Sequence, residues 1–325
     1  MQLPPTVRPV APPVRPVGPN VDTRPLDPIV AGRLALGAPD ATGRMHVSAA
    51  SGLAAAGGSA WIVSDEYGEL GWFADLAKPG LLLPGVPAGK KRPDFESLVR
   101  VPRAEGGDTL VAFGSGSKAD RSRVLVQDID ADGTVAARPV EGSVAPLFAA
   151  FDKVLPLEPN IEGLALRQGA AGAELLAFHR GKQAGDVNTI FRLDATRVLD
   201  ALRAGRPVGA DALLGHQSIE LGTLGGERLG FADATALPDG RIAFVASAEG
   251  GEGVGDGTIK GSVLGVLGAD LTLQSLRPLT GPARKVEGLE RTRELDPAAS
   301  PTSFTLVTDP DEPTVAAEVL TVDVG

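Results

Sequence analysis

A short pattern recurs five times along this 325-residue chain and constrains its fold more than any other feature. In each copy an acidic or small polar residue and then a small residue come just before an apolar stretch. The copies are Ser51-Gly52-Leu53, Glu96-Ser97-Leu98, Glu162-Gly163-Leu164, Asp233-Ala234-Thr235 and Glu287-Gly288-Leu289. Self-similarity at intervals of some tens of residues is typical of repeat architectures, in which each repeat is one supersecondary unit.

Two further apolar stretches follow each copy, and both kinds have the character of β-strands. They are short, contain β-branched and aromatic residues, and are bounded by Gly, Pro, Asp or Asn. The second stretches are residues 60–64, 109–113, 174–178, 241–246 and 303–307, and the third are residues 70–73, 123–129, 189–193, 262–267 and 318–322. Five units of three or four strands predict an all-β fold, a five-bladed β-propeller. A pair of β-sandwiches remains the alternative.

The two ends of the chain are predicted to meet in this ring. Residues 1–28 are rich in proline and are interpreted as an extended tail, so the propeller domain is assigned to residues 29–325. Residues 29–36 have a strand pattern, and we expect them to supply the outer strand of the last blade. Residues 194–205 break the β pattern and predict a short helix, because an aspartate precedes the apolar positions and a glycine ends them.

Composition excludes several classes of function. The formal net charge is −10, and there is no lysine- and arginine-rich run, which argues against binding to nucleic acid or to an anionic membrane surface. The chain has no cysteine and only three histidines, which removes disulfides, thiolate nucleophiles and cysteine zinc sites. No apolar run is long enough to span a membrane, and no signal peptide is recognisable. The sequence leaves the compartment open between cytoplasm and periplasm. We expect a monomer.

The recurring acid is the main candidate for chemistry. The first strand of each propeller blade lines the central channel, so Ser51, Glu96, Glu162, Asp233 and Glu287 are expected to converge on the axis. Four carboxylates in one narrow channel cannot all stay ionised without compensation, so either their pKa values rise or a cation sits among them. Oxygen ligands suit a hard cation, and calcium tolerates their loose geometry best. The pattern predicts a central Ca²⁺; another divalent ion and no ion remain alternatives.

These motifs resemble those of the calcium-dependent apyrase propellers, which hydrolyse nucleoside di- and triphosphates. The resemblance includes the stretch from Phe113 to Lys118 and implies that Ser51, Glu96, Glu162 and Glu287 are calcium ligands, with Asp233 in place of a serine. The chain is also similar to bacterial propellers of unassigned activity, through the segments Gly114-Ser115-Gly116-Ser117 and Phe178-His179-Arg180-Gly181, and more loosely to phytase-like propellers. Each motif has three to five residues, so it transfers a fold more safely than an activity.

Residues that leave the second strands should gather at one rim of the channel. Lys118, Arg180 and Lys182 are predicted to hold a small anionic substrate there, and His179 is the candidate for proton transfer. The alternative is that the cations form exposed ion pairs and that His179 is a structural hydrogen-bonding residue.

The predicted function is therefore a calcium-binding propeller that acts as a phosphohydrolase on nucleotides or phosphate esters. Two alternatives stay open. One is a non-catalytic propeller in which the ion is structural and the rim binds a partner or ligand. The other is a metal-dependent lactonase or esterase on the same scaffold.

Overall fold

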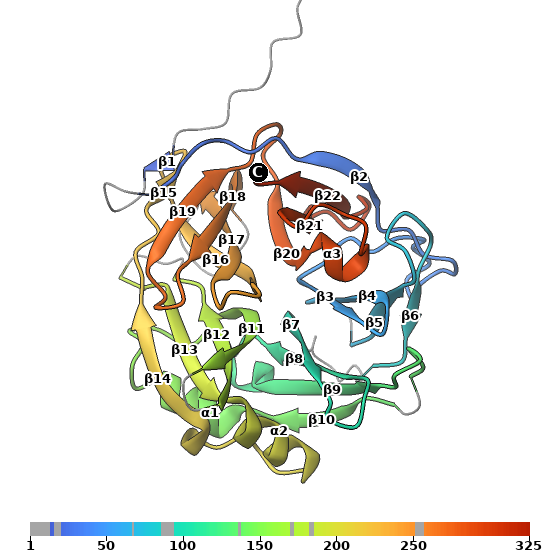
Figure 1. Ribbon diagram of the computed structural model, residues 1–325, viewed down its shortest axis with the longest axis vertical. Helices are drawn as coiled ribbons and strands as arrows, with labels where there is room; N and C mark the ends of the chain where they lie inside the picture. The colour runs from blue at the N-terminus through green and yellow to red at the C-terminus, as the bar shows by residue number, and fades with distance from the viewer. Residues whose placement is uncertain are drawn as a thin grey trace, which may run out of the picture.

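Five β-sheets stand around a central axis in the computed structural model, which confirms the five-bladed β-propeller (Figure 1). The structure describes residues 14–15, 21–66, 68–85, 94–135, 138–169, 172–181, 185–250 and 257–325. Blade 1 contains β3 (Gly52–Ala56), β4 (Ser59–Val63), β5 (Leu70–Phe73) and β6 (Leu81–Leu83). Blade 2 contains β7 (Phe95–Pro102), β8 (Asp108–Gly114), β9 (Arg123–Ile129) and β10 (Val140–Ser143).

Blades 3 and 4 follow in the same antiparallel order from the axis outward. Blade 3 contains β11 (Ile161–Gly169), β12 (Gly172–His179), β13 (Thr189–Asp194) and β14 (Leu213–Ser218). Blade 4 contains β16 (Glu227–Ala236), β17 (Ile242–Gly250), β18 (Thr258–Leu267) and β19 (Leu273–Pro278), and its sheet also includes β15 (Thr223–Leu224) and β1 (Val14–Arg15). The predicted second and third stretches of every unit correspond to strands of these sheets.

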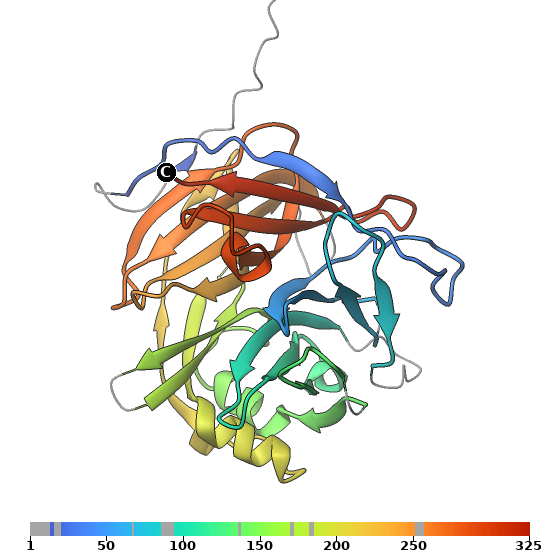
Figure 2. The ribbon, with the colours of Figure 1, turned by 45° about the vertical axis from the view of Figure 1, so that its right-hand side comes forward.

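Blade 5 closes the ring with strands from both ends of the chain. It contains β20 (Lys285–Arg291), β21 (Ser303–Asp309), β22 (Glu318–Asp323) and, as its outer strand, β2 (Ile29–Arg33). Strands β2 and β22 are antiparallel, with Ile29 opposite Thr321 and Arg33 opposite Glu318. This pairing confirms the prediction that residues 29–36 supply the outer strand of the last blade. In both ribbon views the blue segment before β2 runs along the outside of blades 4 and 5 (Figure 2).

Contacts with the propeller begin before residue 29, where the sequence places the end of the tail. Asp22 forms a β-bridge with Ser275, and Leu26 forms one with Leu279. Leu26 is buried. Residues 1–13 and 16–20 of the predicted tail lie outside the described residues.

Apolar side chains fill every boundary between neighbouring blades. Five buried clusters correspond to the five boundaries, one cluster for each pair of adjacent sheets. Their apolar area supplies most of the driving force for closing the ring. The five innermost strands β3, β7, β11, β16 and β20 contact one another in that order and back to β3, and so enclose the channel.

Two of the helices lie at the periphery of the ring (Figure 1). Helix α2 (Ala195–Arg203) lies within the predicted residues 194–205 and is capped by Asp194, whose side chain accepts a hydrogen bond from the backbone N–H of Arg197. Helix α1 (Ala145–Phe151) was not expected; it buries Phe151, which stacks on Phe191 with a ring-centroid distance of 3.8 Å. Helix α3 (Thr292–Leu295) is a single short turn. Among the described residues, no helix is both long and apolar enough to cross a membrane.

Candidate functional site

Four of the innermost strands contain a β-bulge at the recurring sequence pattern. The strand pairing skips one residue in β7, β11, β16 and β20, and the skipped residues are Glu96, Glu162, Ala232 and Glu287. A bulge re-aims a side chain out of the regular alternation of a strand. In three blades that side chain is a glutamate that lines a cavity on the axis. In blade 4 the equivalent position is Ala232, so Asp233 is one residue out of register with the glutamates.

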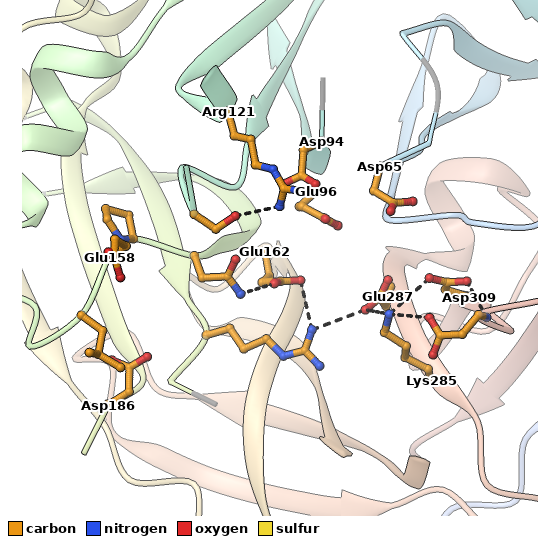
Figure 3. Close-up of a pocket in the computed structure, with 16 residues that line it drawn as sticks. Asp65, Asp94, Glu96, Arg121, Glu158, Glu162, Asp186, Lys285, Glu287 and Asp309 are labelled. Atoms are coloured by element: carbon orange, nitrogen blue, oxygen red, sulfur yellow. Dashed lines mark hydrogen bonds and ion pairs between the residues drawn. The ribbon is translucent and has the colours of Figure 1, made fainter. Parts of the chain in front are cut away.

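The cavity lies where the innermost strands begin and the second strands end, and its volume is about 230 Å³ (Figure 3). Its lining is strongly acidic, with nine carboxyl groups and three cationic side chains. The carboxyl groups belong to Asp65, Asp94, Glu96, Glu158, Glu162, Asp186, Glu287, Asp309 and Asp311, and the cations are Arg121, Arg180 and Lys285. A lining of this charge attracts cations before it attracts anions.

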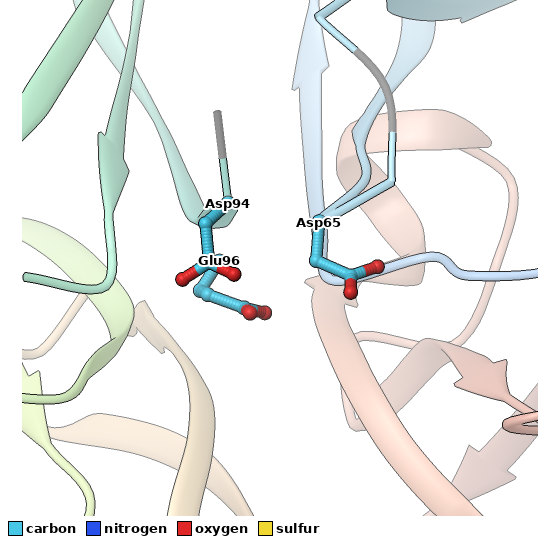
Figure 4. A group of neighbouring side chains, drawn as sticks. All are labelled: Asp65, Asp94 and Glu96. Carbon is cyan, nitrogen blue, oxygen red and sulfur yellow. The ribbon is translucent and has the colours of Figure 1, made fainter. Parts of the chain in front are cut away.

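One group of acids in the cavity has the spacing of a cation site. A carboxylate oxygen from each of Asp65, Asp94 and Glu96 lies within 4.8 Å of the others (Figure 4). The buried Oδ1 of Asp65 has no hydrogen-bond partner among the described residues. Within the described part of the chain, Glu96 makes no hydrogen bond or ion pair. These two side chains therefore offer oxygens that the protein itself leaves uncompensated.

Asp94 is held more firmly than the other two acids. Its Oδ2 accepts a hydrogen bond from the hydroxyl of Ser115 and lies 2.9 Å from the Nη1 of Arg121. Its φ is +58°, a conformation that costs energy in a residue other than glycine. Asp311, on the other side of the cavity, has a φ of +52°. Strained backbone of this kind is found preferentially at functional sites.

Burial and mutual repulsion raise the pKa values of these three acids. Burial, followed by the charge of Glu287, raises the pKa of Asp65 to about 7. Burial and the neighbouring Glu162, Asp65 and Asp94 raise the pKa of Glu96 well above its ordinary value. Burial also raises the pKa of Asp94, although Ser115 and Arg121 oppose the change. A bound cation would reverse these shifts, because it favours the ionised carboxylates.

Two buried cations neutralise the other acids of the channel. The Nη1 of Arg180 lies 3.4 Å from Glu162 and 3.5 Å from Glu287, and its Nη2 donates to Glu249. The Nζ of Lys285 lies 3.1 Å from Glu287, 3.2 Å from Asp309 and 2.9 Å from Asp311. Burial nevertheless raises the pKa of Glu287 to about 7 and that of Asp309 to about 8.

Asp233 does not join the ring of acids. Its Oδ2 accepts a hydrogen bond from the backbone N–H of Leu289 at 2.8 Å, and its Oδ1 accepts one from the N–H of Ala234 at 2.8 Å. The backbone N–H of Leu53 also lowers the pKa of this carboxylate. Asp233 is fully buried and does not line the cavity, so the structure places it as a link between blades 4, 5 and 1.

The other predicted site residues have different surroundings. The hydroxyl of Ser51 accepts a hydrogen bond from the N–H of Asp65 at 3.2 Å, and Ser51 does not line the cavity. Lys118 is exposed beside the cavity residue Ser117. Lys182 lies outside the described residues. Arg180 lines the cavity, and its guanidinium contacts three protein carboxylates, those of Glu162, Glu249 and Glu287.

His179 is fully buried and does not line the cavity. Its Nδ1 accepts a hydrogen bond from the backbone N–H of Asn160 at 2.9 Å. The ring proton therefore lies on Nε2, which donates to Asp186 at 3.1 Å. This arrangement is that of a structural histidine that orients Asp186, the alternative that the sequence left open.

Asp309 is one of the residues that leave the second strands, which the sequence analysis expected at the rim, and it lines the cavity. The sequence analysis did not name Asp94, Lys285 or Arg121 as site residues. Two of them carry a signal that period-two alternation could have revealed. Asp94 and Lys285 stand two residues before Glu96 and Glu287, as Asn160 stands two residues before Glu162, and all three line the cavity. Residues two apart on a strand share a face, so the sequence could have predicted that the residue two positions before each glutamate lines the same cavity. Arg121 lies in the short 3-10 turn Ala119–Arg121, where no repeat marks it.

Comparisons with known proteins identify the family and the fold. Residues 46–324 match the family of unknown function DUF6929. No curated protein matches the chain significantly. Among solved structures, the exo-β-1,3-galactanase from Phanerochaete chrysosporium has a TM-score of 0.51 at 12% identity; the match covers 92% of this chain and 64% of the galactanase chain.

Two further structures resemble the chain at lower scores. A hypothetical protein from Leishmania major has a TM-score of 0.49 at 11% identity, with 91% of this chain and 90% of that chain covered. The α-L-arabinofuranosidase from Podospora anserina has a TM-score of 0.47 at 11% identity, with 94% and 98% covered. At these identities the likeness concerns the fold and leaves the function to the site.

Proposed function

The chain belongs to the DUF6929 family, whose function is unknown, and from its site we propose that it is a hydrolase that depends on a divalent cation. The observation that carries the proposal is the group of Asp65, Asp94 and Glu96, whose carboxylate oxygens lie within 4.8 Å of one another. The buried Oδ1 of Asp65 has no partner, which costs free energy unless a ligand satisfies it.

The donor chemistry of this group fits a hard cation. All three ligands are carboxylates, and there is no histidine or cysteine among the residues that line the cavity. Such a set suits Ca²⁺, Mg²⁺ or Mn²⁺, and we propose Ca²⁺ because it accepts irregular geometry. The five-member central set that the sequence predicts does not fit: Asp233 accepts backbone hydrogen bonds, and Glu162 and Glu287 contact Arg180.

The protein's own residues prepare this position and the space in front of it. Ser115 and Arg121 fix the carboxylate of Asp94, which reduces the rearrangement that ligand binding requires. Across the cavity, Asp186 and Glu158 face the group of three (Figure 3). Asp186 is oriented by His179 and is placed to accept a proton from a water or substrate hydroxyl. A bound cation would supply Lewis acidity to a substrate oxygen or to water.

For the substrate we propose a phosphate ester or nucleotide. Nine carboxyl groups line the cavity and repel an anion. A bound divalent cation would offset this repulsion, so an anionic substrate fits an enzyme that depends on such an ion. Exposed Lys118 and the partly buried Arg121 supply positive charge at this side of the cavity. The motif resemblance to the calcium-dependent apyrase propellers points to the same substrate class.

Glycoside hydrolysis is the second candidate, because two neighbouring carboxyl groups, those of Glu96 and Glu162, have different surroundings. Glu96 has a strongly raised pKa, which suits a general acid. Burial also raises the pKa of Glu162, but the guanidinium of Arg180, which lies 3.4 Å away, opposes that rise. Such a division of roles is what hydrolysis of a glycosidic bond requires. The exo-β-1,3-galactanase from Phanerochaete chrysosporium shares the fold, so β-1,3-galactotriose is the first glycoside to test.

The test combines ion binding with turnover. Chelator-treated protein is titrated with Ca²⁺, Mg²⁺ and Mn²⁺ by calorimetry, and turnover is measured with nucleoside di- and triphosphates and p-nitrophenyl phosphate. Glu96→Gln should lower ion affinity and turnover by roughly 100-fold or more, beyond the 10–100-fold typical of residues that only support ligands. The control is Glu141→Gln, a partly exposed acid on outer strand β10, which should change neither.

Three outcomes would redirect the proposal. Ion binding and a calcium-dependent Tm without turnover of phosphates, lactones, esters or glycosides indicate a structural ion. Glycoside turnover that persists in chelator supports the second candidate. Failure to bind any of the three ions overturns the cation-dependent hydrolase.

A further inference from the structure

Arg180 joins three blades through three buried carboxylates. It follows β12 in blade 3 directly and is 6% exposed. Its guanidinium contacts Glu162 on β11 of blade 3, Glu249 on β17 of blade 4 and Glu287 on β20 of blade 5. Burial lowers the pKa of Arg180, but these three carboxylates raise it by more, so the group stays charged. The side chain thus brings one positive charge to a point where acids from three sheets meet.

Backbone atoms of blades 3 and 4 pack closely around Arg180. The N–H of Arg180 donates to the carbonyl of Asn160 at 2.8 Å, which anchors its backbone beside β11. Gly230 of β16 lies against the aliphatic part of the side chain, and a Cβ at that glycine would be 2.6 Å from the Cγ of Arg180. Gly230 also stands two residues before Ala232, in the position that Asp94 and Lys285 occupy in their own strands. Blade 4 therefore lacks both cavity-facing side chains of the pattern, and Arg180 enters the room they leave.

The acids of the channel consequently divide into two kinds. Glu162, Glu249 and Glu287 each contact the guanidinium, whereas neither Asp65 nor Glu96 contacts a cation in the described part of the chain. A metal ion and a guanidinium cannot share the same carboxylate oxygens at contact distance, because both are positive and both need the same space. The contacts, rather than the total charge on either side, decide where an ion can bind.

We propose that Arg180 is a built-in cation that occupies the position between blades 3, 4 and 5 and keeps metal ions away from Glu162, Glu249 and Glu287. The guanidinium ties these blades together in place of a central ion. Any ion of the proposed function is then confined to the side of Asp65, Asp94 and Glu96. The inference does not require hydrolase activity, because it concerns which acids of the channel are available to an ion.

Arg180→Met tests this directly, since it keeps an unbranched apolar stem beside Gly230 and removes the guanidinium with its charge. Calcium binding is counted by calorimetry, and Tm is measured with calcium and with chelator. We expect Arg180→Met to bind one Ca²⁺ more than the unaltered protein, and we expect its Tm to rise by several degrees with calcium. Adding Glu162→Gln to Arg180→Met should abolish the extra ion. Arg180→Lys, which retains a positive charge, should not gain one.

Two results would overturn the inference. The first is a folded Arg180→Met protein that binds no additional calcium. The second comes from the single variant Glu162→Gln, which does not depend on the folding of the arginine variant. If Arg180 keeps ions away from Glu162, this change leaves the calcium affinity of the protein within about threefold, whereas a loss of tenfold or more makes Glu162 a ligand. Loss of binding in Glu96→Gln bears on the hydrolase proposal alone.

Discussion

The carboxylate of Asp233 in blade 4 accepts a hydrogen bond from the backbone N–H of Leu289 in blade 5, with 2.8 Å between the two atoms. The same carboxylate accepts a hydrogen bond from the N–H of Ala234, and the backbone N–H of Leu53 in blade 1 lowers its pKa. A buried amide N–H needs an acceptor, and this carboxylate supplies one to strands of two different blades. Burial raises the pKa of Asp233 while these amides oppose the rise.

Removing this side chain should destabilise the whole ring. Asp233→Ala leaves amide donors buried without an acceptor, and we expect the free energy of unfolding to fall by about 3 kcal/mol. Asp233→Asn retains a carbonyl oxygen and should cost less. Urea unfolding monitored by circular dichroism measures both. The control, Asp200→Ala, changes an exposed residue of α2 and should stay within about 0.5 kcal/mol. A loss below about 1 kcal/mol for Asp233→Ala would show that the amides find other partners.

A methyl group at Gly163 should also be poorly tolerated. A Cβ there would lie 3.0 Å from the Cα of Asp233 and 3.1 Å from the N of Ala234, and both are backbone atoms that cannot move aside freely. We expect Gly163→Ala to lower the free energy of unfolding by about 1–3 kcal/mol. Gly215→Ala is the matched control in outer strand β14, where no atom lies within 4 Å of the added carbon. Equal stabilities for the two variants would mean that the innermost strands can move apart.

Stability without metal should decrease as the pH rises. The pKa of Asp65 and of Glu287 is raised to about 7 and that of Asp309 to about 8, so between roughly pH 4 and pH 8 the folded protein binds more protons than the unfolded chain. Stability therefore falls with increasing pH across this range. In chelator, we expect Tm to be lower at pH 8 than at pH 5.5. Added calcium should oppose the fall, most strongly at pH 8, because it binds the ionised carboxylates. A Tm in chelator that is constant or rises over this interval would contradict the raised pKa values.

Ser115 should influence the cation site through Asp94. The serine is buried and its hydroxyl donates to the Oδ2 of Asp94, so Ser115→Ala removes a support of that carboxylate. We expect calcium affinity to fall by roughly 10–100-fold with little change in fold. Ser247→Ala is the control, since Ser247 is equally buried and hydrogen-bonds to Ser262 and to the carbonyl of Val286 in blades 4 and 5. A similar affinity for both variants would remove Ser115 from the site.

The repeat made the fold predictable, and its acid-glycine order has a physical reason. In Glu162-Gly163 and Glu287-Gly288, the bulge turns the glutamate into the cavity, and the glycine lets the next innermost strand approach. Pattern matching placed Asp233 one residue off this register, because the preceding Ala232 carries no chemical signal. Likewise, the motif that contains Arg180 gave no indication that three carboxylates would surround it. Those contacts depend on how far each blade projects toward the axis, which a strand pattern does not encode.

The pairing of β2 with β22 sets a limit on when this protein can finish folding. The two strands are separated by nearly the whole chain, and the outer strand of blade 5 has no partner until residues 318–323 have been synthesised. Ile29 is 69% exposed and Val30 is 47% exposed even in the finished sheet. Before the ring closes, β2 is therefore an unpaired apolar strand that can associate with other chains. Translation must therefore deliver the last strand before the first can dock, and slow elongation late in the message would prolong the period in which aggregation competes with folding.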